Sequence, residues 1–549
     1  MKRHLDYPNG SMYDFLCKNA SDWSDLTALN YFGKKISYDT LIKDIDRCAQ
    51  ALYASGIRKG DAVSICLPNI PQAVTALYAV NKLGAAANMI HPLSAEKEII
   101  HYLQISKSKI IIALDINAGK ISCLTKKTTV EKEVYVSISE YMPLWLKTAC
   151  LLTNPKPKLP ANSITWKALL SLADKSSYHV KNTGKADDCA AILYSGGTTG
   201  KPKGIVLTNL NFNALALQSI DSCGCLEKGD KVLSVMPVFH GFGLGVCIHT
   251  VLNFGGTAVI LPKFSVKNFH KILFRYKPNV IAGVPAIYES FIRNSHFDGK
   301  DLSFLKCVIS GGDSLSANTK IRLDKLLKEH GCKSTVREGY GLTECVTGSC
   351  LIPDNSEKRD SVGLPYADTF YKIVDSCTNE ELSFGETGEI VLRGPTVMKG
   401  YLDEPEETAA VLQRHADGYT WLHTGDLGCM DSEGYVYYKQ RMKRMIISSG
   451  YNIYPQNIEN VIYSHNAVLM CAVIGVPDEI KGQRVKAFVV LKNNTYDKQK
   501  IKQEITELLK KETAAYAIPR EIAFVDSLPK TLVGKIAYTE LAESHKTEV

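Results

Sequence analysis

The sequence lacks the cysteine spacing of a metal-binding or disulfide-stabilised protein. Its sixteen cysteines are scattered from Cys17 to Cys471, and no two of them form a CxxC pair. Zinc sites and secreted disulfide scaffolds need closer or more regular spacing, so we expect reduced thiols in a cytoplasmic protein. The first ten residues carry charge but no apolar stretch follows them, and no signal peptide is expected.

Long runs of like charge, internal repeats and low-complexity segments are also missing. The formal net charge is only +8 over 549 residues, which excludes a basic nucleic-acid-binding tail and is compatible with anionic ligands such as nucleotides. Hydrophobic residues make up 45% and charged residues 22%, the balance of a soluble globular protein. A chain of this length exceeds one ordinary core, so two or more domains are expected.

One uncharged stretch is long enough to span a bilayer. No Asp, Glu, Lys or Arg occurs from Leu233 to Pro262. The stretch nevertheless contains five glycines, two prolines, Asn253 and two histidines, and its pattern is that of a strand, a glycine-rich turn, a helix and a second strand. We therefore expect a buried interior segment and not a membrane span.

The first four hundred residues alternate short β-rich runs with helical patterns. Helical periodicity is clear in Tyr38 to Ser55 and in Ile70 to Leu83. The β-rich runs begin near Asp61, Lys109, Lys231, Gly256 and Lys306. This alternation predicts an α/β fold in which mostly parallel sheets are covered by helices.

The pattern changes in the last third of the chain. From Tyr366 it becomes a series of strands separated by turns, which predicts a small antiparallel or β-barrel-like subdomain. After Arg441 a compact α+β unit follows, with helices expected over Pro455 to Ser464 and Asp497 to Ala514. We expect an N-terminal domain over 1–440 and a small, mobile C-terminal domain over 441–549.

The strongest local motif is YSGGTTGKPKG, from Tyr194 to Gly204, directly after the apolar run CAAILY. Such a loop surrounds phosphate oxygens with backbone N–H and hydroxyl donors, because glycine allows a close approach. Pro202 follows the lysine where a Walker loop needs Ser or Thr. A glycine-rich turn can also be purely structural. The accompanying polar residues favour triphosphate binding, and the predicted set is Ser195, Gly196, Gly197, Thr198, Thr199, Gly200, Lys201 and Lys203.

This loop resembles the signature of the adenylate-forming superfamily, which comprises acyl- and aryl-CoA ligases, adenylation domains and luciferases. Four further motifs follow in the order of that family and extend the resemblance over essentially the whole chain: GYGLTE at 339–344, TGD at 424–426, RMKRMIISSGYNIYPQNIE from 441, and GKI at 534–536. The resemblance implies an enzyme that converts a carboxylate and ATP into an acyl-adenylate and then transfers the acyl group to a thiol.

The resemblance also implies roles for individual residues. Lys535 is expected to bridge the substrate carboxylate and the α-phosphate, although a lone lysine is by default a solvated surface residue. Glu344 is expected to bind Mg²⁺, a hard cation that prefers oxygen ligands, and Thr343 to donate to phosphate. Lys443 occupies the family's hinge, about which the C-terminal domain rotates between the two half-reactions.

The nucleotide is expected to contact residues from several motifs. Tyr340 would stack on adenine, Asp426 would accept from both ribose hydroxyls and Arg441 would assist at the ribose. A buried GYG turn could instead exist for packing alone. The other residues assigned to this site by resemblance are Gly311, Gly312 and Asp313 of the adenine-pocket loop, Gly341 and Asn452.

The acid is expected to bind beside the segment MPVFHGFGLG, where His240 resembles the family's mobile gate; a neutral core histidine is the competing interpretation. The predicted pocket walls are Phe239, Gly241, Gly283, Val284, Tyr288, Gly339 and Val346. These short segments offer no Lys or Arg for a second carboxylate and no acidic residue for an amino group, which favours a hydrophobic monocarboxylate.

We predict a medium- or long-chain fatty acid as substrate, with an aryl acid as the alternative because glycines also admit a flat ring. Coenzyme A is the simplest acceptor because no carrier domain is fused to this chain. A carrier protein is the alternative, and a nucleotide-binding pseudoenzyme is the non-catalytic alternative. ATP and Mg²⁺ complete the expected ligands, and no nucleic-acid partner is expected.

The segment 141–160, YMPLWLKTACLLTNPKPKLP, is apolar with a basic flank. It is too short and too interrupted to span a bilayer. It could lie on the inner face of a membrane as a peripheral contact, or form a buried helix with a solvated flank.

Overall fold

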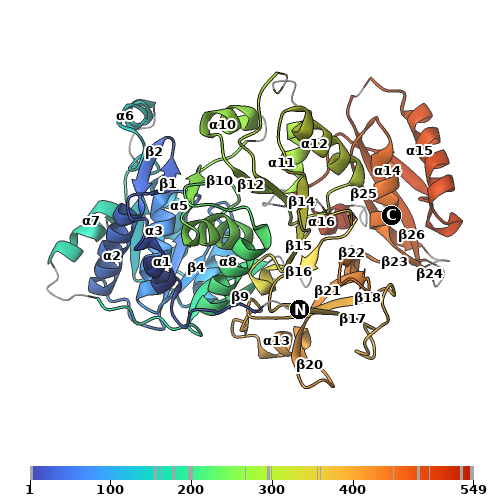
Figure 1. Ribbon diagram of the computed structural model, residues 1–549. Coiled ribbons are helices and arrows are strands. Elements are labelled where there is room, and N and C mark those ends of the chain that lie inside the picture. Colours follow the sequence, from blue (N-terminus) through green and yellow to red (C-terminus); the bar gives the residue numbers. More distant parts are fainter. Residues whose placement is uncertain are drawn as a thin grey trace.

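The computed structural model describes residues 4–153, 157–161, 163–175, 180–195, 202–265, 268–293, 297, 299–354, 356–358, 360–448, 451–478, 482–493, 495–531 and 536–544 (Figure 1). The side chains of Ser195, Tyr451 and Asn452 lie outside this description. Within it, no helix combines the length and the apolar character needed to cross a membrane.

An eight-stranded sheet forms one layer of the N-terminal domain. Its order is β19-β9-β8-β4-β3-β5-β6-β7, and the pairs from β8 to β7 are parallel, whereas β9 and β19 add antiparallel strands at one edge. The strands are β3 (Ala62–Cys66), β4 (Ala86–Met89), β5 (Ile110–Leu114), β6 (Lys132–Val136), β7 (Ser163–Thr165), β8 (Cys189–Ser195), β9 (Lys203–Thr208) and β19 (Gly400–Tyr401).

A nine-stranded sheet forms the second layer, in the order β16-β15-β14-β13-β12-β10-β11-β1-β2. Its pairs from β14 to β1 are parallel. The strands are β1 (Thr27–Tyr31), β2 (Lys34–Ser37), β10 (Lys231–Ser234), β11 (Thr257–Ile260), β12 (Val280–Gly283), β13 (Cys307–Ser310), β14 (Val336–Tyr340), β15 (Cys350–Leu351) and β16 (Leu364–Pro365). The predicted α/β fold with mostly parallel sheets is confirmed.

Helices cover these sheets, and the two predicted with residue ranges form within a residue of those ranges. Helix α2 begins where Ser37 accepts a hydrogen bond from the Thr40 amide, and α3 begins with Pro71. The helices are α1 (Met12–Ala20), α2 (Tyr38–Ala54), α3 (Pro71–Lys82), α4 (Glu96–Ile105), α5 (Ala118–Thr125), α6 (Leu144–Thr153), α7 (Trp166–Ser171), α8 (Asn209–Cys223), α9 (Val251–Asn253), α10 (Phe269–Tyr276), α11 (Pro285–Ile292), α12 (Ala317–Glu329) and α13 (Pro405–Val411).

The uncharged stretch 233–262 lies inside the N-terminal domain, as predicted. It runs from β10 through a π-helix, Phe242–Thr250, and α9 to β11, and most of it is buried. Gly245 allows the π-helix to touch α8, since a Cβ there would lie 2.5 Å from a Leu215 methyl group. The missing charges therefore reflect burial between a helix and a sheet.

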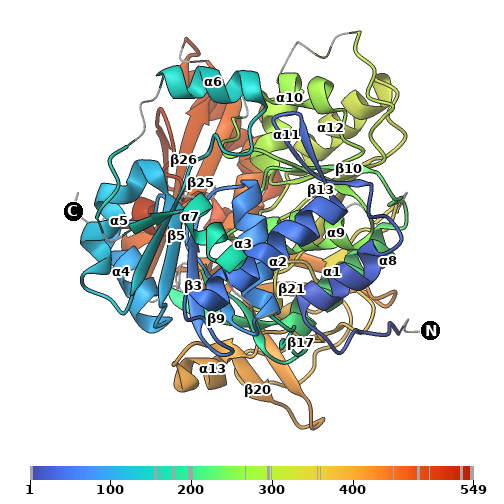
Figure 2. The same ribbon diagram turned by 90° about the vertical axis from the view of Figure 1, so that its left-hand side faces the viewer.

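Helix α6 does not fit the buried-helix prediction for 141–160. All of its residues are described and none is buried. It lies at one end of the molecule, apart from the helices that cover the sheets (Figures 1 and 2). The prediction of a buried helix is therefore wrong.

The predicted antiparallel subdomain is confirmed. Its strands pair in the order β17-β18-β21-β20, with β22 added on β21. They are β17 (Phe370–Val374), β18 (Gly388–Arg393), β20 (Leu412–Arg414), β21 (Thr420–Met430) and β22 (Val436–Arg441).

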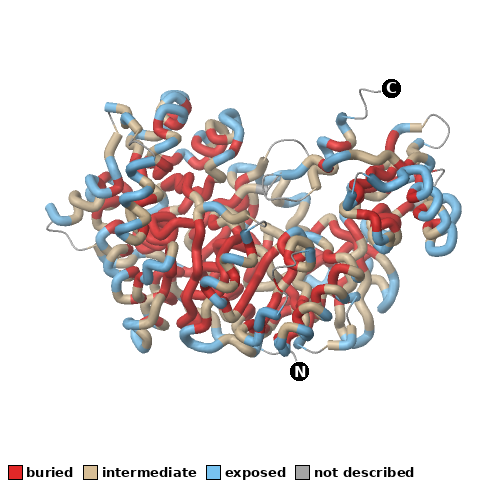
Figure 3. Tube along the Cα trace, turned by 90° about the horizontal axis from the view of Figure 1, so that it is seen from above, coloured by how far each residue is buried: buried red, intermediate tan, exposed pale blue. Residues whose placement is uncertain are grey.

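The C-terminal domain has a sheet and a hydrophobic core of its own (Figure 3). Strands β23 (Ile446–Ser448), β24 (Tyr451–Ile453), β25 (Val468–Asp478), β26 (Gly482–Leu491) and β27 (Glu521–Phe524) pack against α14 (Pro455–Ser464) and α15 (Lys498–Glu512), and α16 (Tyr538–Ser544) ends the described chain. Arg441 still pairs with Asp426 in the preceding subdomain, and the C-terminal sheet starts at Ile446. Residues 442–445 connect the two.

Candidate active site

A cavity of 2370 Å³ lies where the two domains meet. It is larger than the roughly 300–1,000 Å³ of an ordinary ligand pocket. Its walls come from the end of β14, from β21 and β22, from the loop after β13 and, in the C-terminal domain, from β25 and α16. A cavity of this extent has room for more than one ligand group.

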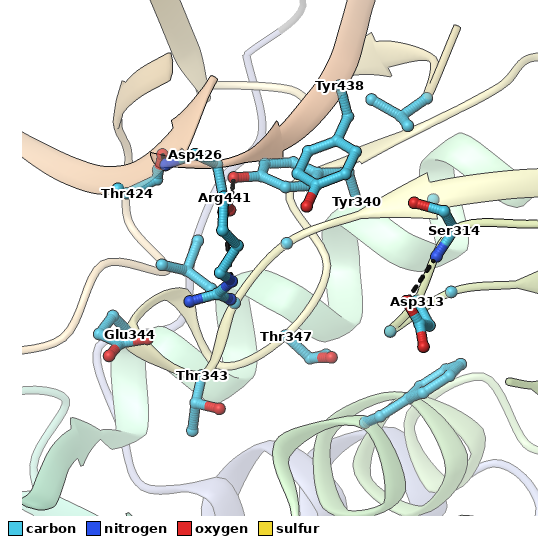
Figure 4. Close-up of a pocket in the computed structure, with 18 of the residues that line it drawn as sticks. Asp313, Ser314, Tyr340, Thr343, Glu344, Thr347, Thr424, Asp426, Tyr438 and Arg441 are labelled. Carbon is cyan, nitrogen blue, oxygen red and sulfur yellow. Dashed lines mark hydrogen bonds and ion pairs between the residues drawn. The ribbon is translucent and has the colours of Figure 1, made fainter. Parts of the chain in front are cut away.

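Asp426 is a buried carboxylate in the wall of this cavity. Its side chain is 2% exposed, it accepts a hydrogen bond of 2.6 Å from the Tyr340 hydroxyl, and its other oxygen lies 3.3 Å from Nε of Arg441. Asp426 and Arg441 face each other across the antiparallel pair β21–β22, which explains how residues from two motifs meet (Figure 4). The carboxylate raises the pKa of the Arg441 guanidinium above its usual value.

Two aromatic rings and three glycines line one part of the cavity, called the slot below, next to this carboxylate. The ring centroids of Tyr340 and Tyr438 are 5.8 Å apart. A Cβ on Gly311 would lie 3.3 Å from the Gly339 carbonyl oxygen, and one on Gly341 would lie 1.6 Å from the Thr347 carbonyl oxygen. Side chains at these positions would fill or break the slot, so its shape depends on glycine. Gly312 and Asp313 line the same cavity, and Asp313 accepts from the Ser314 amide.

Glu344 and Thr343 lie in one short 3₁₀ turn that faces the cavity. The Tyr401 hydroxyl donates to Oε1 of Glu344 at 2.9 Å, and the Met398 amide donates to the Glu344 carbonyl oxygen at 2.7 Å. Lys203, also in the cavity wall, forms an ion pair with Glu407, and its Nζ lies 5.0 Å from the Tyr401 ring centroid. A carboxylate oriented in this way beside lysine suits a cation and the phosphates around it.

A strained turn positions this segment. Val346 has φ 65° and ψ −60°, and the Thr347 amide donates to the Cys345 carbonyl oxygen at 2.8 Å. This is a γ-turn with positive φ, which is rare and costly for a β-branched residue. Gly241 contacts it from the π-helix, because a Cβ there would lie 1.7 Å from the Val346 carbonyl oxygen. Gly241 and Val346, both predicted to face the acid, contact each other instead.

The cavity has an apolar branch inside the N-terminal domain. It lies between α8, the π-helix and strands β10, β12 and β13, and His240 and Phe239 line the same cavity. The Phe239 ring packs at an angle against the His91 ring, with centroids 4.2 Å apart. Nδ1 of His240 accepts a hydrogen bond from the Phe242 amide. The branch is defined here by the described cavity-lining residues of these elements and of the adjoining segments, Ser219, Cys223, Leu226, Val232, Phe242, Val246, Thr250, Val251, Phe254, Val280, Ala282 and Ile309, and none of them is charged.

Three other predicted wall residues lie away from this branch. Tyr288 is 1% exposed, and its hydroxyl donates to the Ile309 carbonyl oxygen at 2.5 Å. Gly283 packs on Ile287, and Val284 precedes α11; neither lines the cavity. Side chains along β12 point alternately to its two faces, and Val280 and Ala282 are the residues of this strand that line the branch. Gly339 does line the cavity.

The C-terminal domain closes the cavity. Lys443 lies in a 3₁₀ turn, Met442–Arg444, at the cavity wall. Thr531 and Ile536 also line the cavity. Several predicted residues lie outside the described residues: Lys535, the loop residues Gly196, Gly197, Thr198, Thr199, Gly200 and Lys201, and the side chains of Ser195 and Asn452.

Sequence reasoning missed several residues of this site. Tyr401 orients Glu344 from a distant strand, Tyr438 forms the second ring of the slot, and His91 packs against Phe239. Thr347 lines the cavity immediately after the strained turn. Tyr438 stands three residues before Arg441, a spacing that predicts opposite faces of a regular strand, and only the bulge in the β21–β22 pairing changes this register.

Comparisons with known proteins match nearly the whole chain. Residues 16–402 match the family model of the AMP-binding enzyme, and residues 457–535 match that of the AMP-binding enzyme C-terminal domain. The chain is 34% identical to a long-chain-fatty-acid–CoA ligase of Bacillus subtilis, over 98% of this chain and 95% of the relative. It is 32% identical to a feruloyl-CoA synthase of Amycolatopsis sp, over 94% and 95%. The crystal structure of an ATP-bound RpMatB-BxBclM chimera is similar, with a TM-score of 0.85 at 27% identity, over 98% of this chain and 99% of that one.

Proposed function

Because this chain belongs to the AMP-binding enzyme family and is an AMP-forming acyl-CoA ligase, we propose that it activates a medium- or long-chain fatty acid and transfers the acyl group to coenzyme A. One observation carries the choice of acid. The uncharged branch of the cavity would bury an alkyl chain, and none of its described lining residues could pair with a second charge on the substrate.

The residues present fit a nucleoside triphosphate. The slot offers the rings of Tyr340 and Tyr438, on which a purine can stack, next to glycines that have no side chain to fill the space. Asp426 offers a buried carboxylate to vicinal hydroxyls, as a ribose presents them. Arg441, which reaches from Asp426 towards Glu344 and Thr343 in Figure 4, supplies positive charge between the sugar and the phosphates.

A divalent cation fits Glu344. Its carboxylate is oriented by Tyr401 and faces the cavity, and Mg²⁺ prefers such hard oxygen ligands. When bound, Mg²⁺ would neutralise charge on the phosphates. The protein's own contribution is to hold the acid and the nucleotide in line and to surround the phosphates with cations, because both reactants are anions.

The proposed chemistry has two steps. In the first, a carboxylate oxygen of the acid attacks the α-phosphorus of ATP, and the bond to the β-phosphate oxygen breaks and releases pyrophosphate. In the second, the thiol of coenzyme A loses its proton and attacks the acyl carbonyl, and AMP leaves. Lys535 is proposed to stabilise the first step, and Lys443 to mark the hinge at which the C-terminal domain turns before the second.

An aryl acid is the second candidate, and the similarity to a feruloyl-CoA synthase favours it. A flat ring is shorter than a long alkyl chain and would fill less of the branch, so the two candidates differ in how much of the branch the acid needs.

A panel of acids tests the proposal. Octanoate, hexadecanoate, benzoate and ferulate are each incubated with ATP, Mg²⁺ and coenzyme A, and acyl-AMP and acyl-CoA are measured by mass spectrometry. We expect hexadecanoate or octanoate to give the highest kcat/KM. Ala282→Phe should lower turnover of hexadecanoate far more than that of octanoate, because added volume blocks the branch, whereas Ala282→Ser should preserve the profile. Preference for ferulate would refute the fatty-acid assignment.

The half-reactions test the role of Lys535 separately. Lys535→Ala should abolish formation of acyl-AMP from acid and ATP, while thioester formation from supplied acyl-AMP and coenzyme A continues. Lys511→Ala removes an exposed lysine from α15 of the same domain and should change neither rate. Equal loss of both half-reactions in Lys535→Ala would contradict the proposed role.

A further inference from the structure

Helix α6 carries an apolar face that points to solvent. Leu144 is 81% exposed, Trp145 65% and Leu152 82%, and all residues of this helix are described. Large apolar side chains that are exposed singly are common on protein surfaces, but a contiguous group of them on one helix marks an interaction site. The helix therefore has its apolar side where a surface helix ordinarily has its polar side.

The arrangement of the side chains around the helix shows that this face is continuous. At about 100° per residue, Leu151, Leu144, Thr148, Leu152 and Trp145 follow one another over an arc of about 120°. The opposite side holds the helix to the domain, because Leu146 and Cys150 are partly buried against the main core. The exposed face is thus set by how α6 is anchored.

Lysine predominates beside this face, where Glu140 faces Lys147 and Asp44 faces Lys34. No Asp or Glu occurs from residue 141 to residue 173, a stretch that contains four lysines, one of them Lys147 within α6. Lys34 and Lys35 of β2 are exposed, and Nζ of Lys34 lies 5.6 Å from the ring centroid of Tyr141 at the start of the segment.

A second helix adds to this basic surround. Helix α10 lies at the same end of the molecule as α6 in both views (Figures 1 and 2), and its Lys271 and Arg275 are exposed. Nη2 of Arg275 donates to the Phe32 carbonyl oxygen at 3.3 Å, which connects α10 to the β1–β2 hairpin. Three separate segments at this end of the molecule, α6 with its flank, β2 and α10, therefore contribute a basic rim of exposed lysine and arginine.

We propose that α6 docks on the surface of an anionic lipid bilayer, with Leu144, Trp145 and Leu152 inserted at the level of the head groups and acyl chains. Interfacial helices combine such an apolar face with flanking lysine and arginine, and tryptophan favours this depth. A second copy of this chain fits less well, since the two basic rims would repel each other and one short helix is small for a stable dimer. Docking is independent of the proposed reaction, because it concerns binding alone.

Vesicle binding tests the proposal without turnover. The full-length protein is sedimented with vesicles of phosphatidylcholine alone or of phosphatidylcholine with phosphatidylglycerol. We expect binding to the anionic vesicles, weaker binding at high salt, and at least a roughly tenfold loss of binding in the variant Leu144→Gln with Trp145→Gln. The matched control is Phe384→Gln, because Phe384 is 63% exposed on a loop of the antiparallel subdomain and should have no effect. Unchanged binding of the double variant, or no binding of the wild type, would overturn the proposal.

Tryptophan fluorescence reports on the same contact directly. Of the four tryptophans, all of them described, Trp145 alone is exposed. Adding anionic vesicles should shift the emission to shorter wavelength in the wild type but not in Trp145→Phe. Sedimentation velocity without lipid tests whether a second copy of this chain covers the apolar face of α6 instead. A wild-type dimer that the double substitution dissociates would assign the face to a second copy and would refute lipid docking.

Discussion

Arg444 and Glu459 form a buried ion pair immediately after Lys443, in the segment that connects the two domains. Nη2 of Arg444 lies 2.5 Å from Oε1 of Glu459, whose side chain is 2% exposed. The same oxygen accepts from the Val473 amide at 2.8 Å and from the Tyr538 hydroxyl at 3.2 Å, and the Arg444 guanidinium stands 3.6 Å over the Tyr538 ring centroid. The Glu459 carboxylate thus connects the turn Met442–Arg444, α14 and α16.

Breaking this pair should destabilise the C-terminal domain. Replacement of one partner leaves the other charge buried without compensation, so Glu459→Gln and Arg444→Met should each lower the free energy of unfolding of that domain by about 3 kcal/mol. Double-mutant cycles from chemical denaturation measure the coupling. The variant that carries both Glu459→Met and Arg444→Met should recover part of the loss, and strictly additive losses would show that the pair is not coupled.

The Tyr340 hydroxyl should act through Asp426 on nucleotide binding. Tyr340→Phe keeps the ring of the slot but removes the 2.6 Å hydrogen bond that orients the carboxylate. A hydrogen bond to a charged group contributes about 1.5–3 kcal/mol, so KM for ATP should rise at least about tenfold while KM for the acid stays constant.

Steady-state kinetics with each substrate varied in turn checks this expectation. Tyr438→Phe is the matched control, because it removes a hydroxyl from the neighbouring ring of the same slot. An equal rise in the KM for the acid would place the effect outside the nucleotide site.

Glu344 should determine how much Mg²⁺ the enzyme needs. Glu344→Gln keeps the side-chain volume and its contact with Tyr401 but removes the charge, so the Mg²⁺ concentration at half-maximal rate should rise by tenfold or more. Pyrophosphate release measured across a Mg²⁺ titration checks this. The exposed Glu404 offers the control Glu404→Gln, and an identical Mg²⁺ curve for Glu344→Gln and wild type would exclude Glu344 as a ligand.

His249 should make the N-terminal domain sensitive to acid. Its Nδ1 contacts the Tyr78 hydroxyl at 2.8 Å and its Nε2 contacts Oδ1 of Asn213 at 3.0 Å, and complete burial lowers its pKa to about 3. Between that pKa and the ordinary value of 6.5 the unfolded chain binds a proton that the native protein does not. Stability therefore falls as the pH drops through this window, by about 1.4 kcal/mol per pH unit.

Denaturation curves between pH 7 and pH 4 measure this dependence. His249→Gln should flatten the slope whatever its effect at pH 7. A variant of His249 with the wild-type slope would disprove its contribution.

Local chemistry in the sequence was enough to predict the fold class and most motif positions. The pattern of apolar residues determined α2, α3 and α14 to within a residue, because helix periodicity, the Ser37 cap and prolines at the first turn act over a few neighbours. The resemblance of the TGD and GYGLTE motifs to the adenylate-forming superfamily, and not local chemistry, assigned Asp426, Tyr340 and Glu344 to the site, and all three line the cavity.

Contacts between distant segments were decided by the tertiary structure alone. The packing of sheets and helices decides three contacts: Tyr401 with Glu344, Gly241 with the strained turn at Val346, and the buried Tyr288 with Ile309. The alternation of side chains along β12 decides that Val280 and Ala282 line the branch. The exposure of the apolar face of α6 was likewise decided by the tertiary structure. An apolar helix has the same local pattern whether a domain covers it or leaves it exposed, since burial is a property of its neighbours in space and not of its own sequence.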